Sequence, residues 1–361
     1  MAGSKKELFF THRLLRWDKE ENLREMPWKG EKDPYRIWLS EIILQQTRVE
    51  QGLAYYNKFI KKYPAINNLA HAPEKDVFKL WEGLGYYSRC KNLIATAKYI
   101  SLELKGKFPS DYESILQQRG IGPYTAAAIA SFAFNLPHAV VDGNVMRVLA
   151  RFFGIATAID SHEGKKSFVE LAGTLLKKDA AAVYNQAIMD FGATVCKPRL
   201  PLCSQCILAD KCIAYIQGAV NEYPVKSKKL TKKHRWFYYL LAENNGEFLV
   251  RKRETKDIWQ NLHEFFLLEA GMQLSLEEII ALPEFKKVAG EKAALIHVSK
   301  TYKQQLTHQT IHGSFVHIKL KNRVHAEGYI SHTKAAFFKL AFPKFITAYF
   351  KERPDFFNTK V

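Results

Sequence analysis

The sequence predicts a multi-domain protein with a mostly α-helical N-terminal domain and an α+β C-terminal domain. Three observations support this fold class. The chain has 361 residues, a length typical of two domains. Apolar residues recur at helical spacings over 34–215, whereas strand-like segments begin after residue 235. Four of the five cysteines lie together at the end of the helical region, in 196–212.

The N-terminal region is divided into helices by short Gly/Pro breaks. In the first of them, Ile37, Trp38, Glu41, Ile42 and Leu44 follow helical spacing, and no Pro or Gly interrupts 35–51. Regular helices between short breaks indicate a compact helical domain, for which we expect the bounds 1–222. The breaks are Tyr63-Pro64, Gly83-Leu84-Gly85, Lys107-Phe108-Pro109, Gly120 to Pro123, Leu136-Pro137 and Asp142-Gly143.

The C-terminal region has a different pattern. Residues 223–235 are rich in Lys and poor in apolar residues, which is typical of a solvated linker. Glu243-Asn244-Asn245-Gly246 is typical of a hairpin turn. We therefore expect an α+β domain over 236–361, with strands at 236–242, 247–251, 265–269 and 314–320 and helices near 276–282 and 334–350.

The cysteine spacing is the most informative motif. Cys196, Cys203, Cys206 and Cys212 are spaced C-x6-C-x2-C-x5-C. Four thiolates in one short loop can enclose a metal at little cost in loop-closure entropy. Thiolate-only ligation suits zinc or an iron–sulfur cluster. Because one C-x2-C pair has a single cysteine on each side, rather than two separated pairs, the spacing favours a [4Fe–4S] cluster over zinc. Buried thiols or disulfides are the weaker alternative.

Charge and hydropathy limit the possible partners and compartments. The formal net charge is +18, and both halves of the chain, divided at Val225, carry an excess of Lys and Arg. A polyanion is the natural partner and nucleic acid the first candidate, although a generally basic protein is the alternative. No secretory h-region and no apolar run of membrane-spanning length occurs. Thiolate ligands need a reducing compartment, so we expect an intracellular protein of the cytoplasm or nucleoid. We expect no membrane among its partners.

A helix–hairpin–helix pattern occupies 111–134. Gly120 and Gly122 permit a tight turn with exposed amides at the start of the next helix. Such amides bind phosphate well. An ordinary helix-to-helix connection is an equal alternative on this segment alone.

Two carboxylates are candidates for glycosidic-bond chemistry. Glu41 has unusually apolar neighbours, which would raise its pKa if it were buried, although a solvated glutamate is the simpler interpretation. Asp142 precedes a helical run, where aspartate is usually an N-cap. A proton-donating Glu with an ionised Asp is the pair that cleaves glycosidic bonds.

Over roughly residues 24–212 the chain resembles the MutY family of adenine DNA glycosylases, within the helix–hairpin–helix/Gly-Pro-Asp superfamily. Each matching stretch is moderately specific, and together they are highly specific. They are Asp33 to Glu41 with Leu44 to Thr47, Trp81 to Arg89, the hairpin, Val141 to Val145, Asn185 to Gly192 and the four cysteines.

The resemblance implies an enzyme that removes adenine opposite 8-oxoguanine or guanine after flipping the base from the duplex. It implies that Glu41 protonates adenine N7 and that Asp142 stabilises the oxocarbenium-like sugar. The implied supporting residues are Asn144 and Tyr124 beside the reaction, Arg24, Trp28 and Gln186 in the adenine pocket, Gln46 and Tyr86 as wedges near the lesion, and Lys197 and Arg199 on a phosphate.

The C-terminal domain resembles the MutT-like domain of the same family. Residues 257–265 match its aromatic-rich stretch, and Thr307 with His308 stand where the family carries a Phe-Ser-His loop against the lesion. The acidic Nudix helix pattern is absent, which argues against nucleotide hydrolysis by this domain.

Three alternatives compete with this interpretation. An endonuclease III-like lyase would need a lysine after the hairpin, where this chain has Tyr124. A DNA-binding module without catalysis would not need Glu41 and Asp142, and an iron–sulfur electron carrier would not need the base-pocket motifs. We therefore expect a monofunctional glycosylase that acts on double-stranded DNA containing adenine opposite 8-oxoguanine or guanine. We expect a monomer, and the sequence does not identify protein partners.

Overall fold

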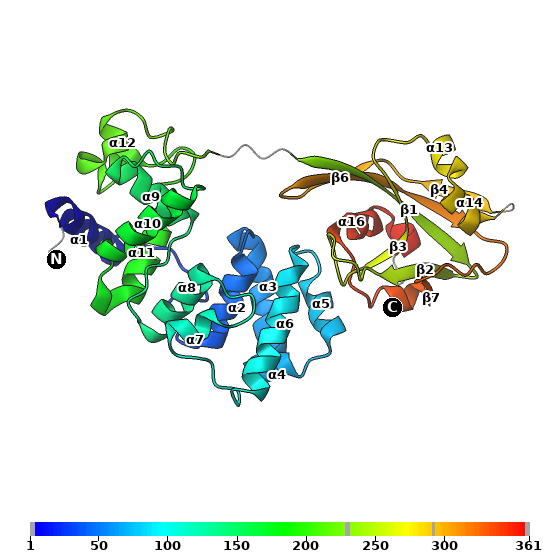
Figure 1. Ribbon diagram of the computed structural model, residues 1–361, viewed down its shortest axis with the longest axis horizontal. Helices are drawn as coiled ribbons and strands as arrows, with labels where there is room; N and C mark the ends of the chain where they lie inside the picture. The colour runs from blue at the N-terminus through cyan, green and yellow to red at the C-terminus, as the bar shows by residue number, and fades with distance from the viewer. Residues whose placement is uncertain (1–3, 228–231, 291–292, 358–361) are drawn as a thin grey trace. The chain divides into compact units, whose positions relative to one another are not determined.

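The computed structural model describes residues 4–227, 232–290 and 293–357 (Figure 1). The chain forms two compact units, one from 1–70 with 95–229 and the other from 71–94 with 230–361. Helix α6 (Tyr87–Leu102) runs through the boundary between the two segments. Of the linker expected at 223–235, residues 228–231 lie outside the described part, and strand β1 already begins at Lys233.

The first unit is helical, as the sequence predicts. Helix α1 was not expected; it begins after a capping box in which Ser4 and Glu7 bond to each other's backbone amides. The helices are α1 (Lys5–Glu20), α2 (Pro34–Leu44), α3 (Val49–Lys62), α4 (Ile66–Ala70), α7 (Tyr112–Leu116), α8 (Pro123–Phe134), α9 (Gly143–Phe153), α10 (His162–Leu175), η1 (Lys178–Ala180), α11 (Ala181–Thr194), η2 (Cys203–Gln205), η3 (Ala209–Lys211) and α12 (Ile213–Ile216).

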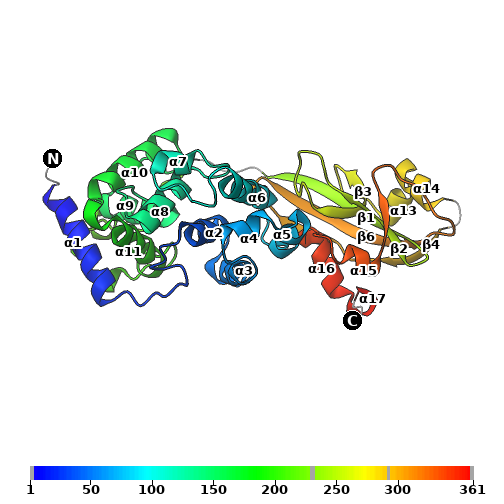
Figure 2. The same ribbon diagram turned by 90° about the horizontal axis from the view of Figure 1, so that it is seen from below.

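One hydrophobic core joins α1 to α9, α10 and α11 (Figures 1 and 2). Phe10, Leu14 and Trp17 of α1 are buried in it, because they follow one another at helical spacing on one face. The Trp17 ring meets the Phe191 ring of α11 edge to face, with centroids 5.0 Å apart. This packing holds α9 and α11 side by side, and both helices carry candidate site residues.

The second unit contains α5 (Glu74–Trp81), the first part of α6 and a seven-stranded mixed sheet. Strand β1 (Lys233–Asn244) pairs in parallel with β6 (Gln309–Lys319), and the other pairings are antiparallel. The expected turn joins β1 to β2 (Glu247–Lys252), with Asn245 and Gly246 both at positive φ, as a tight hairpin requires. The remaining strands are β3 (His263–Ala270), β4 (Ala294–Val298), β5 (Tyr302–Gln305) and β7 (Ile330–Thr333).

Helices cover both faces of this sheet. Tyr238 and Leu240 of β1 share a core with Ile279 of α13 (Leu276–Ala281) and with α14 (Pro283–Ala289). Alternate residues point to the opposite face, where the Tyr239 ring lies 6.2 Å from that of Phe345 in α16 (Lys344–Glu352). Burial on both faces explains the continuous apolar run of β1. The helix expected over 334–350 is divided, because Pro343 separates α15 (Lys334–Phe337) from α16; α17 (Pro354–Phe357) follows.

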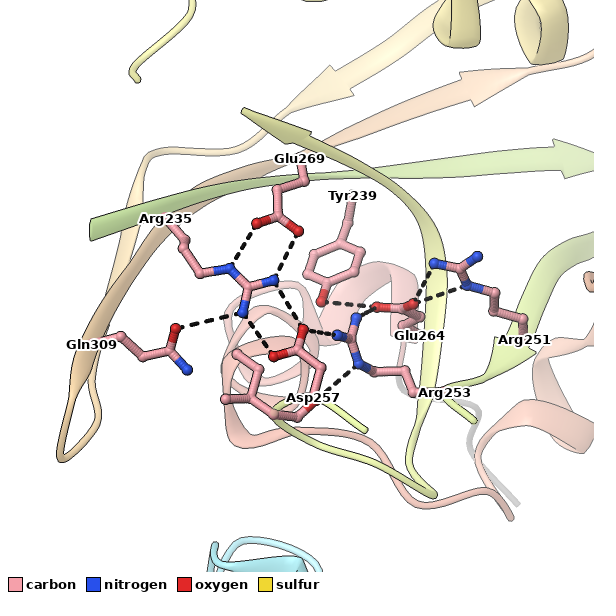
Figure 3. Close-up of polar contacts among 9 residues, drawn as sticks. Arg235, Tyr239, Arg251, Arg253, Asp257, Glu264, Glu269 and Gln309 are labelled. Atoms are coloured by element: carbon pink, nitrogen blue, oxygen red, sulfur yellow. Dashed lines mark hydrogen bonds and ion pairs between the residues drawn. The ribbon is translucent and has the colours of Figure 1, made fainter. Parts of the chain in front are cut away.

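A network of arginines and carboxylates fixes the loop between β2 and β3 (Figure 3). Asp257, in that loop, accepts bonds of 2.9 Å from both Arg235 and Arg253. Arg235 also pairs with Glu269, and Arg253 also pairs with Glu264, which is fully buried. The buried carboxylate is thus compensated, as a charge away from water must be.

No helix in the described ranges is both long enough and apolar enough to cross a membrane.

Candidate functional site

The first unit contains a pocket of about 420 Å³. Its walls come from α2, α8, α9 and α11, from residues 45–49 after α2, and from the segment 21–33 between α1 and α2. A pocket of this size suits a small organic group. The lining residues are Arg24, Met26, Trp28, Ile37, Ser40, Glu41, Leu44, Gln45, Gln46, Thr47, Val49, Tyr124, Phe132, Val141, Asp142, Asn144, Gln186 and Met189.

Glu41 is a buried acid in the wall of this pocket. It lies on α2 among apolar residues and is 7% exposed. Burial raises the pKa of its carboxyl to about 7, and the nearby Asp142 charge adds to that rise. A hydrogen bond from the Tyr124 hydroxyl acts in the opposite direction, because it favours the ionised carboxylate. Glu41 can therefore hold a proton at neutral pH.

Asp142 is the N-cap of α9 and faces the same pocket. Its Oδ1 accepts the Val145 amide at 2.8 Å, and its Oδ2 accepts the Asn144 side-chain amide at 2.7 Å. Burial raises the pKa of Asp142, while these two donors and the Arg147 charge oppose the rise. The cap role expected from the sequence and a role in the pocket are therefore compatible.

Arg147 was missed by the sequence analysis. It is 8% exposed and donates to the Asn144 side-chain oxygen at 2.8 Å, to the Gly192 carbonyl at 2.7 Å and to the Cys196 carbonyl at 2.8 Å. One guanidinium therefore connects the partner of Asp142 to α11 and to the cysteine loop. Its place one turn after Gly143 in α9 was the only signal available in the sequence.

The three residues expected to shape a base pocket, Arg24, Trp28 and Gln186, line this pocket. Trp28 packs edge to face on Tyr56, with ring centroids 5.3 Å apart. Arg24 and Gln186 both bond to the buried Asp190, at 2.7 Å and 2.9 Å. The sequence analysis did not single out Asp190, although its spacing of four residues from Gln186 on a helix places the two on one face.

The two residues expected to act as wedges share an unusual backbone conformation. Gln46 has φ of 55° and Tyr86 has φ of 48°. Positive φ is costly for residues with a side chain and is concentrated at functional sites. Gln46 lines the pocket of the first unit. Tyr86 belongs to the second unit and is 43% exposed.

Thr307 and His308 lie in the turn between β5 and β6, within the second unit. The Leu306 amide bonds to the Gln309 carbonyl at 2.8 Å and closes this turn. The Thr307 hydroxyl is hydrogen-bonded to the hydroxyl of Tyr86, and His308 is exposed. Two of the residues expected near a lesion, Tyr86 and Thr307, are thus in contact.

The four cysteines surround one small cavity with a largely apolar wall. In the described part of the chain, no three His, Cys, Asp or Glu side chains are grouped closely enough to hold one metal ion. Burial raises the pKa of Cys206 to about 12. Four cysteines around a shared cavity fit a cluster-binding loop.

Arg151, a buried residue of α9, donates hydrogen bonds to the cysteine loop. It is 3% exposed and donates to the Lys197 carbonyl at 2.8 Å, to the Val220 carbonyl at 3.0 Å and to the Cys196 sulfur at 3.5 Å. Because the loop backbone bonds inward, Arg199 lies exposed and Lys197 half-exposed on the outside of the loop.

The predicted hairpin joins α7 to α8. Gly120 has φ of 78°, and Gly122 is the N-cap of α8 with open space where a side chain would stand. The Thr96 hydroxyl donates to the Arg119 carbonyl at 2.7 Å and braces the turn. Exposed amides before a helix of this length are suited to a phosphate.

Comparison with known proteins identifies relatives of both sequence and fold. The family model of the HhH-GPD superfamily base excision DNA repair proteins matches residues 39–172. The chain is 36% identical over 258 residues to the adenine DNA glycosylase of Buchnera aphidicola subsp. Acyrthosiphon pisum, covering 71% of this chain and 73% of that protein. It is 27% identical over 391 residues to the adenine DNA glycosylase of Schizosaccharomyces pombe, covering 93% of this chain and 80% of the other.

Solved structures resemble the fold. A thermostable thymine-DNA glycosylase is 31% identical with a TM-score of 0.55, and the match covers 59% of this chain and 98% of that chain. A non-covalent complex of endonuclease III with DNA is 17% identical with a TM-score of 0.52, covering 60% and 99%. The helical fold predicted from the sequence is therefore confirmed.

Proposed function

Because the chain belongs to the adenine DNA glycosylase family, a group of N-glycosyl hydrolases in base excision repair, we propose that it removes adenine paired with 8-oxoguanine or guanine in duplex DNA. The observation that carries this proposal is the presence of a buried, protonatable Glu41 and the capped Asp142 in one pocket.

Glu41 is the proposed general acid. Its pKa of about 7 keeps a large fraction of the carboxyl protonated at neutral pH. A proton delivered to adenine N7 makes the base a better leaving group, because the departing ring no longer carries a full negative charge. An acid with a pKa near the working pH is the most effective donor.

Asp142 is the proposed stabiliser of the positively charged sugar. As adenine departs, charge builds on the sugar ring, and a fixed carboxylate in a pocket away from water stabilises that charge. The Val145 amide, the Asn144 amide and the Arg147 charge all favour the ionised form of Asp142. A water molecule then completes hydrolysis.

The pocket fits a single flipped base. Adenine in a duplex is inaccessible, so it must leave the stack, and a pocket of about 420 Å³ lined by Trp28 and Met26 offers apolar surfaces to its ring. Arg24 and Gln186 supply polar groups. The similarity of the fold to that of endonuclease III in its complex with DNA supports DNA as the binding partner. The surface residues Lys197 and Arg199 and the Gly120–Gly122 turn are the proposed phosphate contacts.

We expect hydrolysis without strand cleavage. A lyase needs an amine to attack the sugar and form a Schiff base. Tyr124 follows the hairpin, and the residues that line the pocket in the described chain include no lysine. The abasic site is therefore left intact.

Two further parts of the chain have proposed roles. The turn with Thr307 and His308 reads the lesion together with Tyr86, and the contact between the Tyr86 and Thr307 hydroxyls supports this. Cys196, Cys203, Cys206 and Cys212 would hold a [4Fe–4S] cluster, which when bound would fix the shape of the loop that carries Lys197 and Arg199.

The test is single-turnover base release from duplexes with adenine opposite 8-oxoguanine or opposite thymine, quenched with and without alkali. We expect release from the first duplex and strand scission only after alkali. Glu41→Gln should reduce the rate by at least about 100-fold, since general acids contribute on that order. Glu50→Gln, on the exposed surface of α3, is the matched control and should leave the rate unchanged.

Scission without alkali would instead assign the protein to the lyase branch. Absence of release by a folded wild-type protein that binds the duplex would leave a DNA-binding module without the chemistry.

A further inference from the structure

We propose that Asp190 is a positioning residue that sets base selectivity by fixing the orientation of the Gln186 amide, and that the same carboxylate holds the segment that carries Arg24 at the pocket. This inference rests on the proposed function, since it concerns how the same pocket distinguishes adenine from other purines. Asp190 itself does not line the pocket.

The Asp190 carboxylate is fully buried and accepts four hydrogen bonds. Its Oδ1 accepts from Arg24 at 2.7 Å and from Gln186 at 2.9 Å. Its Oδ2 accepts from Asn22 at 3.0 Å and from Lys29 at 3.1 Å. Two oxygens offer about four acceptor positions, so the donors present use the whole capacity of this carboxylate. Oδ1 serves the two residues that line the pocket, and Oδ2 serves two residues beside it.

The segment 21–33 depends on these bonds for its position. It has no helix or strand of its own, yet it contributes Arg24, Met26 and Trp28 to the pocket wall. Asn22 and Lys29 attach it near both ends to the same carboxylate on α11. The Lys29 ammonium also donates to the Arg24 carbonyl at 3.1 Å, which ties the two attachment points together. Removing the Asp190 charge would leave Arg24 and Lys29 as neighbouring cations without their shared counter-ion.

The contact with Gln186 has a consequence for recognition. An ionised carboxylate can only accept hydrogen bonds, so the Gln186 amide must turn its nitrogen toward Asp190. Its oxygen is then the group that Gln186 offers to a base. Adenine carries an amino donor at position 6, where guanine carries an oxygen acceptor. An amide oxygen held in this orientation favours adenine and repels guanine, and a site built for such a bond rejects analogues that lack the donor.

The experiment compares adenine with purine, which lacks the 6-amino group, each placed opposite 8-oxoguanine in single-turnover assays. The measured quantity is the adenine-to-purine rate ratio, taken relative to the wild-type ratio so that the different lability of the two bases cancels. For Asp190→Asn we expect this ratio to fall by about 10-fold, because the Gln186 amide oxygen is no longer held toward the base and its hydrogen bond to the 6-amino group is lost. Gln186→Ala should lower the ratio similarly, and the double variant should lower it no further.

A second variant covers the case in which Asp190→Asn fails to fold. Asp190→Glu keeps the buried charge as a counter-ion to Arg24 and Lys29 but moves the carboxylate by one methylene relative to the Gln186 nitrogen, and should lower the same ratio. Asn22→Ala weakens the attachment of 21–33 but leaves the contact between Gln186 and Asp190 intact, so it should slow the release of both bases alike and keep the wild-type ratio. Thermal unfolding monitors the fold of each variant.

Several outcomes decide the matter. A wild-type protein that releases no adenine contradicts the proposed function, before any variant is considered. If the wild type is active and Asp190→Asn slows both bases equally, the ratio is unchanged and Asp190 is merely structural. An additive fall in the double variant, or an equal fall with Asn22→Ala, would overturn the action of Asp190 through Gln186.

Discussion

At the scale of single residues, Glu41 and Asp142 are two carboxylates in one pocket with different surroundings. Burial raises the pKa of Asp142, but an amide at a helix N-terminus, the Asn144 side chain and the Arg147 charge oppose that rise and favour its ionised form. Glu41 has apolar neighbours and one hydroxyl partner, Tyr124. Environments that separate the protonation of two like groups are what divides acid from charge stabiliser in such pairs.

This difference predicts the pH dependence of base release. Because Glu41 must be protonated to act as an acid, the single-turnover rate should be high below pH 7 and fall as pH rises through about 7. The Tyr124 hydroxyl stabilises the ionised carboxylate, so Tyr124→Phe should raise the pKa of Glu41 and move the falling limb to higher pH. A pH series of single-turnover rates for both proteins measures this. A limb that moves to lower pH in Tyr124→Phe would mean that the hydroxyl stabilises the protonated acid instead.

At the scale of elements, α9 and α11 approach each other closely beside the pocket. A side-chain carbon at Gly192 of α11 would lie 2.7 Å from the Asn144 Cβ and 3.1 Å from its carbonyl oxygen. No rotation of a flexible side chain relieves contacts with backbone atoms. Glycine at this position therefore lets α9 bring Asn144, and with it Asp142, to its place.

Gly192→Ala should consequently destabilise the protein and impair the site together. We expect the free energy of unfolding to fall by about 1–3 kcal/mol, as for overpacking in a core, and base release to slow. Gly173→Ala in α10 is the matched control, because nothing lies within 4 Å of the added carbon. That change should be neutral or stabilising by about 0.5–1 kcal/mol. Denaturant unfolding and single-turnover rates test both; an unaffected Gly192→Ala would show that the helices can separate without harm.

The sequence predicted local features of this architecture better than long-range ones. Four features depend on residues that are neighbours in the sequence, so local patterns predicted them. They are the helix around Glu41, the cap at Asp142, the cysteine loop and the β1–β2 turn. The roles of Asp190 and Arg147 depend on hydrogen-bond partners that are distant in the sequence, and no local pattern reveals those partners. Strands β4, β5 and β7 have only four or five residues, too few for a clear alternation. Helix α1 was missed, although Ser4 and Glu7 form a capping box at its start.

At the scale of the whole molecule, a net charge of +18 favours a polyanionic substrate. Basic residues occur in both halves, so electrostatic attraction to DNA is a property of the entire chain, and binding should weaken with salt as counterion release becomes less favourable. The proposed chemistry belongs to the first unit and the proposed reading of the lesion to the second. With these proposed roles, selective excision at a damaged pair would use both units.

The double variant Thr307→Ala/His308→Ala tests the second unit's part. We expect the ratio of release rates for adenine opposite 8-oxoguanine to adenine opposite guanine to fall, because the hydroxyl and imidazole proposed to contact the lesion are gone. The matched control is Thr301→Ala/His325→Ala, which changes an exposed threonine and an exposed histidine elsewhere in this unit. An unchanged ratio in the first variant, with normal thermal unfolding, would remove the turn from lesion recognition.

The backbone at Gln46 and Tyr86 has a consequence for laboratory evolution of this protein. Both residues hold a left-handed φ that costs on the order of 1–3 kcal/mol each and that glycine adopts freely. A selection for heat resistance alone would therefore reward glycine at 46 and 86, and each gain in melting temperature there would delete a proposed DNA contact. Thermostable variants of this enzyme should be sought under simultaneous selection for repair.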